Sequence, residues 1–321
     1  MRYEVDEGIF EIAVARREKQ KAVIGFIGPS GSGKTVSALR LAYGMMKEAY
    51  PDADEKELWS KIGVADTEHK RALLYWNEQF GDMRVGEFLH IDFTPPYTTD
   101  RYNAAVQALK KTGCEVIIVD SLSHNWQGKG GIIETHSNMT GNSFQNWGKL
   151  SSETTSLIET LTTNNVHVIC TMRTKTEYVV ELNEHGKMAP RKVGTKPVQK
   201  DEFEYEFMIN FIVNMEGVSE TSKDNTRLFE GESKIITEED GGKLYRWVEL
   251  GVDVKSEEEA KRAAAEEERQ ALIHTIQSMV SADPNLESKV TNFEFKANQK
   301  LENFSKVLLK TAIERLKGED K

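Results

Sequence analysis

The residues with the clearest chemical meaning form one glycine-rich loop, Gly28-Pro29-Ser30-Gly31-Ser32-Gly33-Lys34-Thr35. Glycines in such a loop let the backbone wrap closely around phosphate groups and turn several N–H groups toward them. The pattern also lets Lys34 reach the β- and γ-phosphates and lets the Thr35 hydroxyl ligate Mg²⁺. An apolar run precedes the loop, and apolar residues at helical spacing follow it from Val36 onward. The loop and Val36 therefore predict a nucleoside triphosphate site, with ATP and Mg²⁺ as the expected ligands.

Two carboxylates follow apolar runs that are typical of buried strands. Asp120 ends the run 116–119, and a carboxylate there can hold the water shell of Mg²⁺ opposite a phosphate loop. Glu68 lies just past the run 62–66, where it could orient an attacking water molecule. The alternative for Glu68 is a carboxylate at a helix N-terminus, stabilised by the helix dipole.

Polar and cationic residues follow another apolar run, 166–170. Thr171 and Arg173 are candidates for sensing the γ-phosphate, and a solvated strand exit is the alternative. We count Arg173, with Lys34 and Glu68, among the catalytic candidates. Residues 173–200 hold seven Lys or Arg and three Glu, a local net charge of +4 in a chain of net charge -10. Such a cluster could meet DNA phosphates. Alternatively, Arg191 and Lys192 could reach a triphosphate on a neighbouring subunit, or the run could be an ordinary solvated hairpin.

Aromatic and basic residues alternate between residues 123 and 150. Trp126, Phe144 and Trp147 lie there among Lys129 and Lys149. This mixture suits stacking on single-stranded bases, although aromatic side chains can equally hold a loop onto a core. We treat as DNA-binding candidates three members of this segment and one of the basic run: Lys129, Trp147, Lys149 and Lys196.

The bulk properties restrict the class of protein. The net charge of -10 argues against a surface coated with basic side chains for nucleic acid. The two cysteines, Cys114 and Cys170, are far apart and favour buried thiols in a reducing cytoplasm. We find no apolar run of the roughly 18–20 residues that would span a bilayer. We therefore expect a cytoplasmic protein that does not enter the membrane.

Apolar runs at 22–27, 62–66, 88–93, 116–120 and 166–171 predict strands, and helical patterns at 102–111 and 150–161 separate some of them. Such alternation predicts an α/β fold with a doubly wound, mainly parallel sheet. We further expect a helix at 10–21, a loop at 128–148, a hairpin with its turn at 183–186 and a strand at 207–213. Short edge elements are expected at 226–229 and 244–247.

The composition changes after Asp253. Ser256 and Glu259 resemble a capping box that opens a charged helix, and Asp283-Pro284 should end it. We divide the chain into a core of residues 1–252 and a segment, 253–321, that holds a charged helical linker and a small helical module. A helical tail that packs on a partner subunit is an equal alternative.

The combination of motifs resembles known ATPases. Asp66-Thr67-Glu68-His69 and Val119-Asp120-Ser121-Leu122 resemble the core of RecA-type ATPases. Over residues 10–235 the chain resembles phage-encoded "AAA domain" ATPases with RecA-like cores. The resemblance rests on the phosphate loop, on the segments at 120–126 and 171–178, and on shorter motifs near residues 190, 197 and 204. The resemblance implies ATP hydrolysis, with Lys34 and Thr35 on phosphate and magnesium, Asp120 on magnesium and Glu68 as base. One departure is that Glu206-Phe207-Met208 lacks the acidic residue expected after Phe207.

We therefore expect a RecA-like P-loop ATPase core with a small helical C-terminal module. Its expected work is Mg-dependent, DNA-stimulated ATP hydrolysis on single-stranded DNA in phage recombination or replication, in the host cytoplasm. The expected assembly is a homo-oligomeric ring or filament with sites between subunits. One alternative is an ATP-dependent switch or loader that recruits a replication partner. Another is a small-molecule kinase, for which only the lysine-rich run 173–200 could form the lid. A packaging motor fits less well because no acidic nuclease segment follows the core.

Overall fold

The computed structural model describes residues 2–4, 11–163, 165–182 and 188–317. Contacts along the chain divide it into two compact units. One unit is residues 19–250, and the other joins residues 1–18 with residues 251–321. Our division into functional domains at residue 252 stays a prediction.

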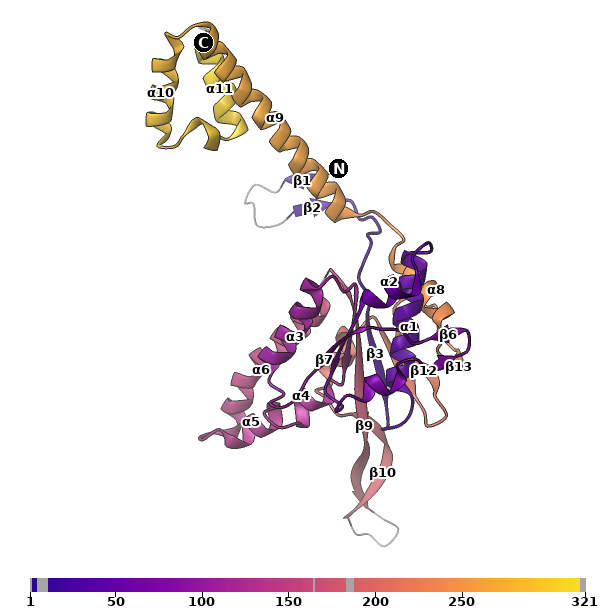
Figure 1. Ribbon diagram of the computed structural model, residues 1–321. Helices are drawn as coiled ribbons and strands as arrows, with labels where there is room; N and C mark the ends of the chain where they lie inside the picture. Colours follow the sequence, from indigo (N-terminus) through magenta and orange to yellow (C-terminus); the bar gives the residue numbers. More distant parts are fainter. Residues whose placement is uncertain (1, 5–10, 164, 183–187, 318–321) are drawn as a thin grey trace. The chain divides into compact units, whose positions relative to one another are not determined.

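A nine-stranded sheet forms the centre of the unit 19–250 (Figure 1). Its main path runs β13-β12-β11-β3-β9-β8-β4-β7. Every neighbouring pair on this path from β11 to β7 is parallel. Strand β12 is antiparallel to β11 and β13, and β10 is antiparallel to β9. The strands are β3 (Val23–Gly28), β4 (Ile62–Asp66), β7 (Leu89–Asp92), β8 (Val116–Asp120), β9 (His167–Leu182), β10 (Met188–Pro197), β11 (Ile209–Val213), β12 (Val218–Asp224) and β13 (Ser233–Ile235).

Helices cover both faces of this sheet. They are α1 (Lys34–Ala49), α2 (Glu55–Ser60), α3 (Thr99–Lys111), α4 (Ser123–Gln127), α5 (Ile132–Asn138), α6 (Ser143–Thr162), α7 (Glu202–Glu206) and α8 (Glu238–Val248). In Figure 1, α1, α2 and α8 lie on one side of the sheet and α3 and α6 on the other. The expected α/β fold with a mainly parallel sheet is confirmed.

Strands β3, β4 and β8 are almost entirely apolar because each one is buried on both faces. Along β3, Ile24 and Phe26 join the core beneath α1 and α8, whereas Val23 and Ile27 join the core beneath α3 and α6. Successive side chains of a strand point to opposite faces, so a sheet covered on both sides needs a continuous apolar run. This requirement explains why the strand predictions at 22–27, 62–66 and 116–120 match the structure so closely.

Helices α1 and α8 pack unusually close together. A Cβ atom at Gly44 would lie 1.8 Å from the carbonyl oxygen of Glu238. Near the same contact, the side chain of Arg40 donates to Glu238 at 2.9 and 3.1 Å. The close approach therefore depends on the missing side chain at position 44.

Several expected elements differ from the structure. The predicted helix at 10–21 is strand β2 (Glu11–Ala13) followed by irregular chain, because residues 14–20 are exposed and offer no face for packing. The predicted loop at 128–148 holds α5 and the start of α6, whose first N–H groups are capped by the Asn142 side chain. The edge element at 244–247 is part of α8, which opens with a Thr237–Asp240 capping box. Residues 226–229 form a turn on the Asp224 carboxylate, and the hairpin turn at 183–186 lies outside the described residues.

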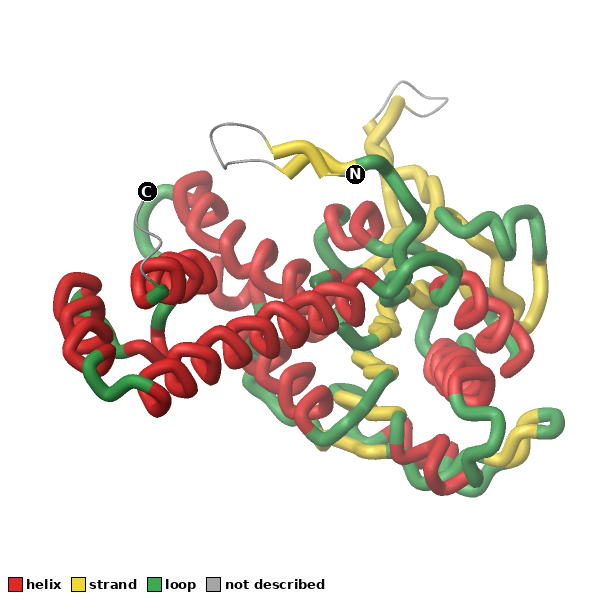
Figure 2. The backbone as a smooth tube through the Cα atoms, turned by 90° about the horizontal axis from the view of Figure 1, so that it is seen from above, coloured by secondary structure: helices red, strands yellow, loops and turns green. Residues whose placement is uncertain are grey.

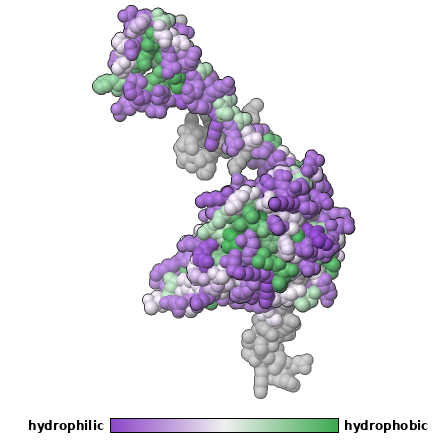
Figure 3. Space-filling view, in the orientation of Figure 1, coloured by the Kyte–Doolittle hydropathy of each residue, from purple (hydrophilic) through white to green (hydrophobic). Residues whose placement is uncertain are grey.

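Between residues 254 and 317, the described part of this segment, the chain forms three α-helices: α9 (Val254–Ala282), α10 (Leu286–Ala297) and α11 (Lys306–Leu316). The cap of α9 is Asp253, whose side chain accepts from the Ser256 N–H at 3.0 Å, so the predicted role of Ser256 as cap is wrong. The helix ends before Asp283-Pro284, as predicted. Ile276, Phe304 and Leu309 are buried in the hydrophobic core that these helices share. Figure 2 shows these helices in red, and Figure 3 shows green side chains between them.

The remaining described elements are short. Strand β1 (Arg2–Glu4) pairs with β2, and β5 (Gln79–Phe80) pairs with β6 (Met83–Arg84). Two 3₁₀ turns, η1 (Arg71–Tyr75) and η2 (Leu301–Asn303), follow β4 and α10. Among the described helices, none is both long enough and apolar enough to cross a membrane.

Candidate active site

The glycine-rich loop joins β3 to α1, and Lys34, Thr35 and Val36 lie in the first turn of that helix. Gly31 and Gly33 have φ angles of 86° and 85°, the left-handed region that glycine adopts without strain. The Ser32 hydroxyl is buried and has no hydrogen-bond partner within the described protein. A helix N-terminus with an unused buried donor is suited to an anionic ligand.

Lys34 is folded back onto its own loop. Its Nζ donates to the carbonyl oxygen of Pro29 at 2.6 Å. Burial lowers the pKa of Lys34, and the nearby carboxylates of Asp120 and Glu68 oppose this shift. The ammonium group is therefore held at the loop by a neutral acceptor, which a phosphate oxygen can replace.

Asp120 links two hydroxyl groups at the end of β8. One carboxylate oxygen accepts from Thr35 Oγ1 at 2.6 Å, and the other accepts from Thr171 Oγ1 at 2.5 Å. Burial raises the pKa of Asp120, and the two hydroxyl bonds oppose that rise. The contact with Thr171 arises because β9 lies between β3 and β8 in the sheet. Thr35 and Asp120 together form an oxygen-ligand pair of the kind that suits Mg²⁺.

Glu68 follows β4, and its side chain points toward the pocket that Lys34, Thr35 and Asp120 line. Its carboxylate accepts from Ser121 Oγ at 3.1 Å and from Arg173 Nε at 2.7 Å, and its second oxygen pairs with another nitrogen of Arg173. Burial by itself would raise the pKa of Glu68, but the hydrogen bonds and charge of Arg173 outweigh it and the net shift is downward. The candidate base is therefore an ionised carboxylate held by an arginine.

The alternative role considered for Glu68, a helix N-terminal carboxylate, is performed by another residue. Asp66 accepts from the N–H of Glu68 at 2.7 Å and from the N–H of Ala72 at 3.0 Å. Its second oxygen also lies 3.3 Å from His90 Nε2. Asp66 thus fixes the chain that leads into η1, which leaves the Glu68 side chain to face the pocket.

A hydrogen-bond network behind the site connects the ends of β4 and β8 with Arg173 of β9. The Thr67 hydroxyl accepts from the Ser121 N–H at 2.8 Å and lies 2.6 Å from His124 Nδ1. The Ser123 hydroxyl accepts from the Arg173 N–H at 2.8 Å. The chain that follows β4 and β8 is therefore joined to itself and to Arg173 of β9 by side-chain bonds as well as by the sheet. The sequence motifs contain Ser121 and Ser123 but gave neither residue a role, although both lie within three residues of the end of β8.

These groups surround one pocket of about 110 Å³. It is lined by Ser30, Gly31, Gly33, Lys34, Thr35, Glu68, Arg71, Tyr75, Asp120 and Arg173. Arg71 and Tyr75 were not predicted, because they lie on η1, a short turn whose direction depends on Asp66. Arg71 approaches the Glu68 carboxylate at 3.7 Å. The structure therefore brings together phosphate-binding, metal-binding and base candidates from four separate segments.

The other predicted residues are distributed more widely. Arg191 and Lys192 lie on β10, but their side chains are outside the described part of the chain. Lys129 and Lys149 are exposed, and Lys196 pairs in register with Lys175 of β9.

Trp147 lines a second pocket, of about 360 Å³. Lys129, Lys149 and Lys196 are not among the residues that line it. Trp147 and the three lysines therefore do not line this pocket together.

Comparison with protein families matches residues 20–231 to the family described as "AAA domain". Among solved structures, a KaiC-like protein, PH0186 from Pyrococcus horikoshii OT3, is similar with a TM-score of 0.36 and 15% identity, over 67% of this chain and 84% of that one. The flagellar accessory protein FlaH from Methanocaldococcus jannaschii is similar with a TM-score of 0.32 and 14% identity, over 68% and 89%. Comparison with curated proteins finds no match.

Proposed function

The chain belongs to the AAA-domain family of P-loop ATPases, and from this premise we propose that it binds and hydrolyses Mg-ATP at the pocket of residues 28–35. The observation that carries the proposal is the meeting of the Lys34 loop, the Thr35–Asp120 pair and the Glu68 carboxylate in one pocket. A loop alone can bind phosphate. Hydrolysis also requires a metal-holding pair and a group that can position water.

The residues of the pocket fit the proposed substrate. The loop N–H groups and the free Ser32 hydroxyl can donate to phosphate oxygens, and Lys34 can exchange the Pro29 carbonyl for a phosphate. Tyr75 also lines this pocket. Thr35 and Asp120 would hold Mg²⁺, which neutralises phosphate charge when it is bound.

Glu68 and Arg173 would act as a pair. While Arg173 donates to both oxygens of Glu68, the carboxylate has little capacity to accept a bond from water. A γ-phosphate would compete for the guanidinium, because both ligands are oxyanions. Arg173 would then stabilise phosphate charge, and Glu68 would be free to orient the attacking water.

We further propose that the chain acts on single-stranded DNA in phage recombination or replication, as a homo-oligomer in the host cytoplasm. The basic run at 173–200 and the aromatic segment at 123–150 support a nucleic-acid role. In the oligomer, Arg191 and Lys192 would reach the triphosphate of a neighbour.

The closed Glu68–Arg173 pair also favours a second candidate function, an ATP-dependent switch that recruits a replication partner. In a switch, ATP binding would separate Arg173 from Glu68 without rapid hydrolysis of the ATP.

Measurement of ATP turnover with and without single-stranded DNA tests these proposals. Lys34→Ala should abolish ATP binding and turnover, whereas the control Lys47→Ala, an exposed residue of the same helix, should keep both. Turnover that rises with DNA would support the DNA role. A wild-type protein that binds ATP without measurable turnover would support the switch. A wild-type protein that binds no ATP would overturn the proposal.

A further inference from the structure

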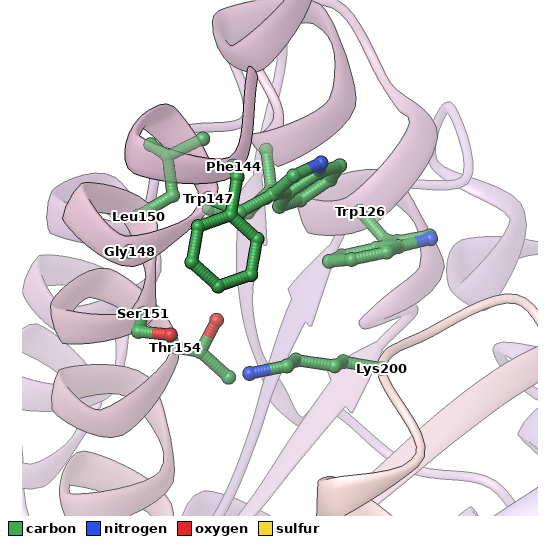
Figure 4. A pocket seen from close by; sticks show the side chains of 9 residues that line it. Trp126, Phe144, Trp147, Gly148, Leu150, Ser151, Thr154 and Lys200 are labelled. Atoms are coloured by element: carbon green, nitrogen blue, oxygen red, sulfur yellow. The ribbon is translucent and has the colours of Figure 1, made fainter. Parts of the chain in front are cut away.

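A second pocket lies between α4, α6 and the chain just after β10 (Figure 4). Trp126 comes from α4, Phe144 and Trp147 come from the first turns of α6, and Lys200 enters from the other side. The pocket has a volume of about 360 Å³. Figure 4 shows the Lys200 ammonium directed toward Thr154 beneath the aromatic rings.

The aromatic rings form a layered wall. The Trp126 and Trp147 ring centroids are 5.9 Å apart with planes inclined by 27°, and His136 stacks on Trp147 at 4.0 Å and 18°. Phe144 is 86% exposed and Trp147 is 38% exposed. A ring that serves only to hold a loop onto the core would be buried, so this alternative does not account for Phe144.

We propose that this pocket binds one unstacked base of a single strand, with the base against the aromatic wall and the backbone phosphate near Lys200. The inference rests on the proposed action on single-stranded DNA and adds the site at which a base is held. Stacking on aromatic side chains beside a cation is how proteins hold single strands without reading their sequence.

Size and charge favour a base over a peptide segment. A pocket of about 360 Å³ lies near the lower limit of ligand pockets, roughly 300–1,000 Å³, which suits one ring system better than a helix of a partner protein. Ser151 and Thr154 supply hydroxyl groups at the wall for the polar edge of a base. Lys200 is the charged side chain among the lining residues, and its ammonium also pairs with Glu202 at 2.8 Å. A backbone phosphate could replace the Glu202 carboxylate as the partner of this ammonium, because both are oxyanions.

The pocket is joined to the ATP site through the start of α4. Ser123 begins the helix that carries Trp126, and its hydroxyl holds the backbone of Arg173. Gln199, next to Lys200, donates to the carbonyl oxygen of Leu122 at 3.0 Å. A base that shifts Trp126 or Lys200 would therefore act on the segment that holds Arg173 against Glu68. This connection gives single-stranded DNA a route by which to open the Glu68–Arg173 pair.

The test measures binding of a fluorescent oligothymidylate and of the same oligonucleotide with abasic sites, together with the ratio of ATP turnover with and without oligonucleotide. Phe144→Ala and Trp147→Ala should raise the dissociation constant about 5- to 150-fold, the range expected for one lost stacking contact. Both should also lower the turnover ratio toward one. Phe295→Ala is the matched control, because Phe295 is 84% exposed in the other unit and should keep the wild-type affinity.

Thermal melting checks that the pocket variants are folded, and the high exposure of Phe144 predicts an unchanged midpoint for its variant. Wild-type affinity in both pocket variants would overturn the inference, as would equal affinity of the wild-type protein for the abasic oligonucleotide. If the wild-type protein hydrolyses ATP but binds no oligonucleotide, this inference fails while the ATPase proposal stands. If the wild-type protein binds the oligonucleotide through the pocket without hydrolysing ATP, the ATPase proposal fails and the pocket stands.

Discussion

Replacing Glu68 with glutamine removes the charge of the candidate base and keeps its size. Loss of a general base typically slows a reaction by about 10²- to 10⁴-fold, which corresponds to about 3–5 kcal/mol in the activation free energy. The amide oxygen can still accept from Ser121 or Arg173, but the amide NH₂ group would face the guanidinium donors. We therefore expect Glu68→Gln to keep ATP binding and to lose turnover by at least 100-fold.

The same substitution has a smaller effect on stability. Hydrogen bonds to charged groups contribute about 1.5–3 kcal/mol, but Arg173 is 36% exposed and solvent screens its charge. We expect a loss of about 1 kcal/mol, or a fall of about 2–4 °C in the melting temperature of a unit of this size. Such a change cannot account for a 100-fold loss of turnover at 25 °C.

The assay is single-turnover hydrolysis of radiolabelled ATP, with nucleotide binding measured separately by a fluorescent ATP analogue. Glu78→Gln is the control, because Glu78 is an exposed carboxylate ten positions along the chain from Glu68. Turnover of Glu68→Gln within about threefold of wild type would refute the assignment of Glu68 as the base. Loss of ATP binding in this variant would refute the claim that Glu68 acts in hydrolysis and is not needed for ATP binding.

Three further outcomes follow from the structure. The folded-state pKa of Glu68 is lowered from its ordinary value of 4.5, so its bond with Arg173 stabilises the fold above about pH 4.5, and this stabilisation is lost as the pH falls further. Urea unfolding should therefore show the stabilities of the wild type and Glu68→Gln converging at acidic pH. A stability difference that stays constant with pH would contradict this prediction. Gly44→Ala should destabilise the fold by about 1–3 kcal/mol because the added Cβ would force α1 and α8 apart, and an unchanged thermal midpoint would be inconsistent with that packing. Lys200→Gln should reduce the slope of log binding constant against log salt by about 0.7 for single-stranded DNA, and an unchanged slope would exclude a phosphate contact there.

Predictions from the sequence succeeded where the signal is local. The phosphate loop is recognisable because its glycines, lysine and threonine act within eight consecutive residues. Strands β3, β4 and β8 are recognisable because burial on both faces requires unbroken apolar runs. The break at Asp283-Pro284 follows from the proline ring, which cannot continue a helix.

Predictions failed where an element depends on its packing partners. The start of α6 is rich in polar residues and glycine, so its composition is typical of a loop, yet Asn142 caps it and Leu150 and Leu157 are buried against the core. The segment 244–247 has strand-forming residues, but the capping box at Thr237 starts a helix that packs on α1. Short patterns of this kind fit more than one element, and tertiary contacts select between them.

The sequence by itself determined the chemistry that is available: a loop for phosphate, carboxylates at strand ends and aromatic rings beside cations. Only the tertiary structure decided which of these groups meet. Placing β9 between β3 and β8 brings Thr171 to Asp120 and Arg173 to Glu68, contacts that join residues 51 and 105 positions apart in the chain. The same folding sets Trp126, Trp147 and Lys200 around one pocket. Strand order is settled by the packing of both sheet faces at once, and no local pattern records it.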